Sequence, residues 1–333
     1  MKTVLITGVA GFIGSNLAEA LLSLGYRVIG LDNLSQGSTQ NIAGFLANPR
    51  FEFHSGDVRD SREVEGLIGR ADSVMHLAAY KIPRYGNALD TIEINTQGTR
   101  NVLRSAAKVH RLVVFASTSD VYGRNPDVPF HEGSDLWMGP SNVPRWSYAI
   151  SKMFDEHLCF AFQREFGLPV VVVRFFGGYG PRQNLSWWGG PQSVFINAAI
   201  RGEPMEIHGD GSQTRSFTYV SDHVEGLIRC LEHDESVGQV FNLGNTVEIS
   251  ILDLAGLVWR LAGTGEPIYR MVPYRAFGKY EDVKRRIPDI SKAKKLLGFE
   301  PQIGLDEGLR WTIEWQRLAM NGLALESTRL KVG

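Results

Sequence analysis

The chain has 333 residues, a formal net charge of −1 and 43% hydrophobic residues, which is enough apolar material for one large domain or two of ordinary size. Its near-neutral charge gives no electrostatic reason to expect a nucleic acid or an anionic membrane as a partner. The two cysteines, Cys159 and Cys230, lie in apolar segments without metal-ligand spacing, so we expect a reducing compartment, no disulfide framework and no metal site.

Short apolar runs alternate with helical patterns along the first half of the chain. The runs alternate little between apolar and polar residues, as expected of parallel strands that are buried on both faces. A helical pattern over 15–25 has Ser15 in its first turn and ends at Gly25. We therefore predict an α/β fold with a Rossmann-type, doubly wound parallel sheet. Its predicted strands are 3–8, 27–32, 51–57, 73–79, 112–117 and 170–176.

After about Arg174 this regular alternation fades. Residues 177–192 are rich in glycine and proline and predict a long loop. The following segments predict a smaller α/β lobe with helices over 193–202 and 249–263 and strands over 203–209 and 240–245. We predict a first domain over 1–175, with a return segment near 218–245, and a second lobe over 176–333.

The turn after the first predicted strand carries Gly8, Gly11 and Gly14. Glycines there let the backbone approach a pyrophosphate, which then binds the amides and the positive dipole end of the next helix. Three glycines can also simply make a tight turn, so this motif alone is a weak indicator. Asp32 ends the second predicted strand, where a carboxylate accepts hydrogen bonds from an adenosine ribose and repels a 2′-phosphate. We therefore predict bound NAD rather than NADP.

Other residues near this turn are predicted to complete the NAD site. Asp57 and Val58 follow the third strand and are placed to meet the adenine edge. His76 is interpreted as a packing residue rather than a catalyst. The predicted NAD contacts also include Phe12, Ile13, Asn33, Ser35, Leu77, Ala78, Ala79, Lys81, Asn95, Tyr148 and Lys152.

Tyr148 and Lys152 are four residues apart in a segment of helical spacing, so their side chains share one face. We expect the nearby ammonium to lower the pKa of the phenol towards neutrality. Such a tyrosine takes a proton from a hydroxyl while a hydride leaves the same carbon. The pair alone also fits an ordinary amphipathic helix. Thr118, at the end of a predicted strand, makes the combination more specific because it can bind the same substrate oxygen.

Together with "STSDVYG", "GDGSQTRSFTYVSD" and "RRIPDISKAKKLLGFEP", these motifs resemble the extended short-chain dehydrogenase/reductases that modify nucleotide sugars. The resemblance extends to about Trp315. It implies that Thr118, Tyr148 and Lys152 form the catalytic set and that Asn95 braces the active-site helix. It also implies that Arg215 and Arg286 hold the diphosphate or ribose of the substrate. We predict Arg182 and Asn184 as further substrate-binding residues.

The resemblance implies a common first step, in which a hydride leaves sugar C4 for NAD and a 4-keto sugar forms. A 4-epimerase then returns the hydride to the other face of the ketone. The segment "RFFGGYGPRQ" and the pair Arg84-Tyr85 resemble glucuronate and other hexose 4-epimerases. An epimerase must also hold the sugar carboxylate so that CO2 is not lost, and Ser119 and the loop after Arg182 are candidates for that contact. We predict a UDP-glucuronate or UDP-hexose 4-epimerase with tightly bound NAD.

The alternative is a UDP-glucuronate decarboxylase that forms a UDP-pentose through the same step. Such enzymes typically have Thr-Ser-Glu before "VYG", an arginine three residues before the tyrosine, and another in an R-x-P-D-I segment. This chain has Asp120 in place of the glutamate, together with Arg145 and Arg286. It departs from them also at Gly177, where an asparagine is typical and its absence predicts either a gap in the substrate floor or a different sugar pose. Asp120 is equally compatible with a structural role in capping the strand turn.

Three further interpretations are weaker. A 4,6-dehydratase would carry Asp-Glu after the threonine, where this chain has Ser119 and Asp120. A non-catalytic NAD-binding module would usually have lost the tyrosine or the lysine. A conventional dehydrogenase would exchange its cofactor with solvent.

The long loop also contains Trp187 and Trp188. We expect these two side chains either to form a lid over the site or to fill the space between the two lobes.

The resemblance also implies a homodimer built through two helices of each subunit. The apolar residues Met153, Phe154, Leu158 and Phe162 are compatible with such an interface and equally with an internal core. The first residues lead directly into a predicted strand, and no apolar run reaches the length of a membrane span. We therefore expect a cytoplasmic protein whose partners are a UDP-sugar substrate and a second copy of the chain.

Overall fold

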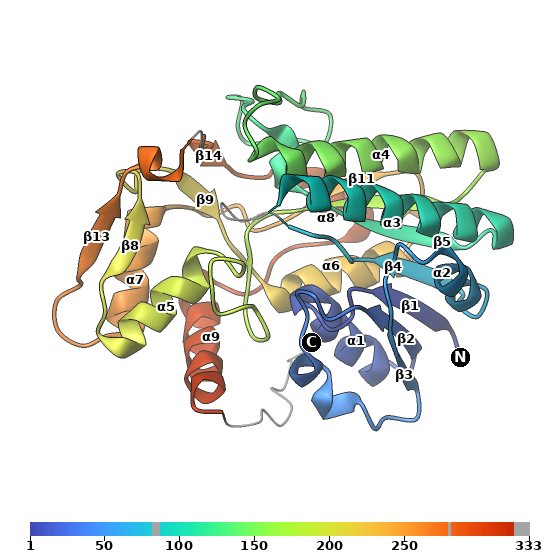
Figure 1. The fold of residues 1–333 in the computed structure, drawn as a ribbon, viewed down its shortest axis with the longest axis horizontal. Helices are drawn as coiled ribbons and strands as arrows, with labels where there is room; N and C mark the ends of the chain where they lie inside the picture. Colours follow the sequence, from blue (N-terminus) through green and yellow to red (C-terminus); the bar gives the residue numbers. More distant parts are fainter. Residues whose placement is uncertain (82–86, 279–280, 323–333) are drawn as a thin grey trace.

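The computed structural model describes residues 1–81, 87–278 and 281–322. Its centre is a seven-stranded sheet in the order β11-β6-β5-β4-β1-β2-β3, with every neighbouring pair parallel (Figure 1). This confirms the predicted α/β fold. The strands are β1 (Thr3–Thr7), β2 (Arg27–Asp32), β3 (Phe51–Ser55), β4 (Ser73–His76), β5 (Leu112–Thr118), β6 (Val170–Phe175) and β11 (Val240–Leu243).

Helices cover both faces of this sheet, which explains why its central strands are mostly apolar. On β1, Val4 and Ile6 are buried in the cluster that includes α1 and α6, whereas Leu5 between them is buried in the cluster that includes α2, α3 and α4. Figure 1 shows α3 and α4 side by side. The bounds are α1 (Phe12–Ser23), α2 (Ser61–Ile68), α3 (Ala88–Val109), α4 (Trp146–Phe166), α6 (Val220–Glu232) and α8 (Ser291–Leu297).

The first helix begins earlier than the sequence pattern predicted. It starts at Phe12, directly after Gly11, and the Ser15 hydroxyl donates to the Gly11 carbonyl oxygen at 2.7 Å. The glycine turn therefore leads straight into the amino end of α1, so that the free amides of the first turn lie beside it. The helix ends at Ser23, and Gly25 follows with φ +90°.

In the part of the chain that the structure describes, the second lobe contains α5, α7 and α9 and several small sheets. In one, β8 and β13 are parallel; in another, β9 lies between β12 and β14. β11 belongs to the main sheet although its neighbours in sequence belong to this lobe. The division at residue 175 stays a prediction. The remaining elements are α5 (Pro191–Arg201), α7 (Ile251–Ala262), α9 (Leu305–Met320), β7 (Gly178–Tyr179), β8 (Met205–His208), β9 (Thr214–Ser216), β10 (Thr218–Tyr219), β12 (Glu248–Ser250), β13 (Tyr269–Val272), β14 (Arg285–Arg286) and the 3₁₀ turns η1 (Thr39–Asn41), η2 (Ala43–Phe45), η3 (Ser119–Tyr122), η4 (Asp234–Ser236) and η5 (Tyr274–Phe277).

Within the described ranges, none of the helices has the length and apolar character that a membrane span requires. The same ranges contain no group of three or more His, Cys, Asp or Glu side chains arranged to hold a metal ion.

Candidate active site

A cavity of about 840 Å³ opens at the carboxyl ends of the central strands, beside β1, where the strand order reverses. One wall comes from the sheet and α4, and the other comes from the second lobe. Many residues singled out in the sequence line it: Gly8, Gly11, Phe12, Ile13, Gly14, Asp32, Asn33, Ser35, Val58, Leu77, Ala78, Ala79, Lys81, Thr118, Ser119, Asp120, Arg145, Tyr148, Lys152, Arg182, Asn184, Arg215 and Arg286.

The glycine turn leaves no room for side chains. Gly8 has φ +76°, and a Cβ there would lie 2.8 Å from the Ala78 amide nitrogen. A Cβ on Gly14 would overlap the Gly8 carbonyl group. The turn is thus a backbone cradle at the amino end of α1, which is the geometry that a pyrophosphate requires.

Asp32 stands at the end of β2 beside this cradle and is 8% exposed. Its two carboxylate oxygens accept hydrogen bonds from the amides of Ala10 at 2.9 Å and Leu34 at 2.8 Å. Burial raises the pKa of Asp32, and these two backbone donors oppose that effect. Each carboxylate oxygen can accept a further hydrogen bond, and Asp32 lines the cavity, so it fits the hydroxyls of an adenosine ribose.

Two of the predicted cofactor residues do not line the cavity. The Asp57 carboxylate binds Arg59 at 2.8 Å and accepts from Asn33 at 2.9 Å, and the hydrogen bond from Arg59 lowers the pKa of Asp57 to about 2. Asn95 is 2% exposed and lies behind the site. It accepts from the Tyr80 amide at 2.7 Å and donates to the Ser151 hydroxyl at 3.0 Å, so it ties α3 to α4.

Tyr148 and Lys152 lie one turn apart on α4, opposite Thr118 at the end of β5. The Lys152 ammonium is 1% exposed and donates to the Ala116 carbonyl oxygen at 2.8 Å. A hydrogen bond joins the side chains of Thr118 and Tyr148. The three groups therefore converge on one wall of the cavity, where they could bind one hydroxyl and move its proton.

The expected lowering of the pKa of Tyr148 by Lys152 is wrong for this arrangement. Burial raises the pKa of the phenol, and the charge of Asp120 raises it further, whereas the hydrogen bond from Thr118 only partly opposes them. The ammonium is directed at the Ala116 carbonyl instead. Low-dielectric surroundings disfavour a phenolate more than an indirect positive charge favours it.

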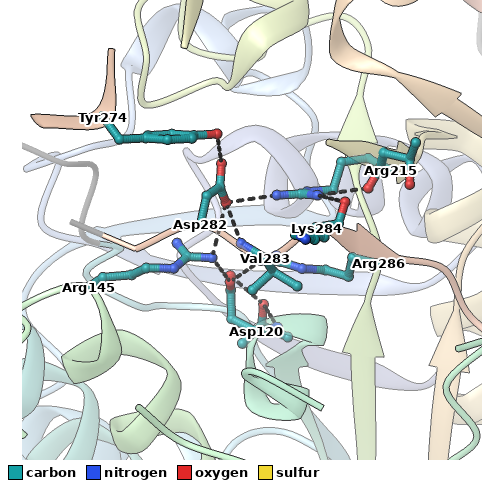
Figure 2. A network of polar contacts seen from close by, with 10 residues as sticks. Asp120, Arg145, Arg215, Tyr274, Asp282, Val283, Lys284 and Arg286 are labelled. Atoms are coloured by element: carbon teal, nitrogen blue, oxygen red, sulfur yellow. Dashed lines mark hydrogen bonds and ion pairs between the residues drawn. The ribbon is translucent and has the colours of Figure 1, made fainter. Parts of the chain in front are cut away.

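A cluster of charged side chains lines the same cavity (Figure 2). Asp120 pairs with Arg286 at 2.8 Å and lies 3.6 Å from Arg145. Burial alone would raise the pKa of Asp120, but the charges of these arginines hold it below its usual value. The Asp120 carboxylate faces the arginines and also accepts a hydrogen bond from the Thr118 hydroxyl at 3.3 Å, so it contacts both the charged cluster and the end of β5.

The cluster continues through Asp282, which the sequence analysis missed. Its carboxylate pairs with Arg215 at 2.8 Å, lies 3.7 Å from Arg145, and accepts from the Tyr274 hydroxyl at 2.9 Å. Burial lowers the pKa of Arg215 to about 10, and Asp282 opposes that shift. In sequence, Asp282 is one acidic residue in a charged segment, and only its position four residues before Arg286 could have indicated it.

The other predicted substrate residues lie apart from this cluster. Arg182 donates to Glu19 on α1 at 2.8 Å and to the Ser15 carbonyl oxygen at 3.1 Å, so its guanidinium is held by the first domain. Asn184 is exposed, and its side-chain oxygen accepts from the Ser186 amide at 2.9 Å within the loop. Arg84 lies outside the described residues.

The two tryptophans of the long loop have different neighbours. Trp187 stacks on His208 with ring centroids 4.2 Å apart and packs with the main core, as expected of a filling residue. Trp188 reaches Tyr80 of the first domain in an edge contact at 5.5 Å. At Gly177, φ is +46° and a Cβ would overlap the Ser216 carbonyl group, so the backbone here suits glycine.

Comparisons with known proteins agree with this geometry. The family model described as GDP-mannose 4,6 dehydratase matches residues 5–312. A UDP-N-acetyl-alpha-D-glucosaminuronate decarboxylase of Bacillus cytotoxicus is 38% identical over 95% of this chain and 98% of its own. UDP-glucuronic acid decarboxylase 1 of Xenopus tropicalis is 39% identical over 95% of this chain and 72% of its own. A crystal structure of UDP-glucuronic acid 4-epimerase from Bacillus cereus, in complex with UDP-glucuronic acid and NAD, has a TM-score of 0.85 and 30% identity and covers 95% of this chain and 99% of that one.

Proposed function

This chain belongs to the extended short-chain dehydrogenase/reductases that modify nucleotide sugars, and we propose that within this family it is a decarboxylase of UDP-linked hexuronic acids. Its cofactor is NAD, as in the family and in the NAD-bound structures that it resembles. The sequence alone favoured a 4-epimerase, with the decarboxylase as the alternative. The curated relatives at 38% and 39% identity are decarboxylases, which favours the alternative.

The first step is oxidation of the sugar at C4. Bound NAD supplies the hydride acceptor and a positive charge, which favours the phenolate of Tyr148. Tyr148 accepts the proton of the C4 hydroxyl, and Thr118 orients that oxygen by a hydrogen bond. Lys152 adds a buried positive charge on the same helix. The product is a 4-keto hexuronate.

The observation that carries the decarboxylase proposal is the contact of Asp120 with Arg286 and Arg145. Three segments of the chain bring these residues together on the wall of the cavity, where we propose that the sugar binds. These are the positions at which the chain resembles the decarboxylases, with aspartate in place of glutamate. Because its pKa is lowered, Asp120 is ionised and orients the arginines rather than donating a proton.

The chemistry of the second step follows from the ketone. In a 4-keto hexuronate the carboxylate at C6 is β to the C4 carbonyl, so the C5–C6 bond breaks with release of CO2 and its electron pair enters an enolate. A proton then adds at C5, and the hydride returns to C4 to give a UDP-pentose. The arginines bind the carboxylate and diphosphate of the substrate by paired hydrogen bonds.

A 4-epimerase of the same substrate is the second candidate. It is favoured by Gly177, whose left-handed backbone lets β9 pack against the end of β6 in a segment that resembles the epimerases. The similarity to the Bacillus cereus UDP-glucuronic acid 4-epimerase supports the same candidate.

The test uses protein purified with its own NAD and UDP-glucuronate labelled at C6, with UDP-N-acetylglucosaminuronate in parallel. Stoichiometric release of labelled CO2 with formation of a UDP-pentose supports the proposal. Conversion to the C4 epimer without CO2 would instead support the second candidate. Turnover of neutral UDP-hexoses alone would refute both, because the arginines would then have no carboxylate to bind.

We also propose that the protein is a homodimer that associates through α3 and α4. Phe154 on α4 is 44% exposed and Ile92 on α3 is 40% exposed, which leaves apolar side chains on both helices at the surface. Phe162, in contrast, is buried in the core, and Met153 and Leu158 pack partly against internal clusters. Of the apolar residues noted on this helix, Phe154 is thus the one available for the interface.

A further inference from the structure

A buried carboxylate that the proposed reaction does not use lies on the active-site helix. Asp155 follows Lys152 by three residues on α4 and has no exposed surface. One of its oxygens accepts from the Thr99 hydroxyl of α3 at 2.9 Å, and the other has no hydrogen-bond partner within the described residues. A buried carboxylate with one unpaired oxygen is costly, so its retention here calls for a reason.

A chain of hydrogen bonds fixes the orientation of this carboxylate. His76 Nε2 lies 3.2 Å from the Thr99 hydroxyl, and its Nδ1 lies 2.7 Å from the Thr7 hydroxyl. Burial lowers the pKa of His76 to about 3, so the ring is neutral with one donor and one acceptor. Because Thr99 donates its only proton to Asp155, Nε2 donates to Thr99 and Nδ1 accepts from Thr7. Every donor in the chain therefore points towards Asp155.

The charge of Asp155 acts on both catalytic groups of the helix. Burial lowers the pKa of Lys152, and Asp155 is the largest influence that opposes this shift. Asp155 also contributes to the raised pKa of Tyr148. Its own pKa is raised by burial to about 6, although Lys152 and the Thr99 hydrogen bond oppose that shift. The other charged or titratable groups that face it are Glu156 and Cys159 of α4, Arg100 of α3 and His76 of β4.

We propose that Asp155 is a positioning residue whose negative charge sets the pH window in which Tyr148 and Lys152 work. The inference rests on the proposed function only for its first step, oxidation of the sugar hydroxyl, and holds whichever second step follows. The acid limb of the rate profile reports deprotonation of Tyr148, and the alkaline limb reports loss of the Lys152 proton. Removing the charge of Asp155 weakens proton binding at both residues, so both limbs move to lower pH.

The test compares the pH profile of hydride transfer in the wild-type holoenzyme with that of Asp155→Asn. The readout is the near-ultraviolet absorbance of bound reduced dinucleotide after UDP-glucuronate is added. We expect both limbs to move down by roughly one pH unit. Glu165→Gln, which removes an exposed carboxylate from the same helix, is the matched control and should leave both limbs in place.

Thr99→Val provides a second variant in case Asp155→Asn does not fold. Loss of the Thr99 hydrogen bond raises the pKa of Asp155, so Asp155 loses its negative charge at a higher pH. Without that charge Tyr148 binds its proton less tightly, so the acid limb moves to lower pH. A variant that retains its NAD and shows a lower rate with unmoved limbs would overturn the inference and leave Asp155 a structural residue. Absence of CO2 release despite normal hydride transfer would refute the decarboxylase proposal alone.

Discussion

The two halves of the cavity are built by different means. The cofactor half consists mainly of backbone groups, from three glycines and the amino end of α1. It has one carboxylate, that of Asp32. The half that we propose binds the substrate, called the substrate half below, consists of charged side chains, in which Arg145, Arg215 and Arg286 face two aspartates. A backbone cradle is made by residues close in sequence, whereas the charged cluster joins distant segments. The first half is therefore specified locally, and the second depends on the whole fold.

The largest effect is expected where the halves meet, at Tyr148. Tyr148→Phe removes the proton acceptor of the first step, so kcat should fall by about 10²–10⁴-fold while the protein still retains NAD. Steady-state rates with UDP-glucuronate and the dinucleotide content of the purified protein measure the two effects separately. Tyr269→Phe, at an exposed tyrosine of the second lobe, serves as the control. Full activity of Tyr148→Phe would show that the acid/base group is misassigned.

The substrate half is tested by Arg286→Gln. Asp120 then loses its closest partner and the substrate carboxylate loses a donor, so kcat/KM should fall by roughly 10²-fold. Its neighbour Arg285 is a matched control, because it is largely exposed and pairs with Glu248 outside the cavity. Equal losses in Arg286→Gln and Arg285→Gln would contradict the assigned cluster. The NAD content should be unchanged in both.

The cofactor half is tested by Gly8→Ala. The new methyl group meets the Ala78 amide, and alanine is strained at φ +76°, so the folded state should lose about 1–3 kcal/mol and most of its bound NAD. Urea unfolding and dinucleotide content check both consequences. Gly44→Ala is the control, since Gly44 has open space around it. NAD retention at the wild-type level in Gly8→Ala would exclude the cradle as the pyrophosphate site.

The smallest expected effect is a difference in salt dependence between the two halves of the cavity. Charges that are partly open to solvent are screened, so KM for UDP-glucuronate should rise a few-fold between low and high ionic strength. Retention of NAD, which depends on backbone groups and burial, should change much less over the same range. A larger salt effect on NAD retention than on KM would reverse the comparison drawn between the halves.

The same contrast explains how much could be predicted from the sequence. The sheet and the glycine turn follow from local patterns, because apolar runs and glycines act within a few residues of one another. Arg182 lines the cavity as expected of a substrate contact, which stays a prediction, and its pairing with Glu19 of α1 joins residues 163 positions apart that no local pattern could have linked. The role of Asp282 and the raised pKa of Tyr148 depend on burial and on neighbours that only the fold provides.

The central claim is that this protein oxidises C4 of a UDP-hexuronate with its own bound NAD and then releases CO2. The most direct measurement uses UDP-glucuronate deuterated at C4, with no dinucleotide added. The account predicts a UDP-pentose that keeps the deuterium at C4, together with one CO2 per product. A pentose product without the label, or conversion that needs added NAD, would contradict it.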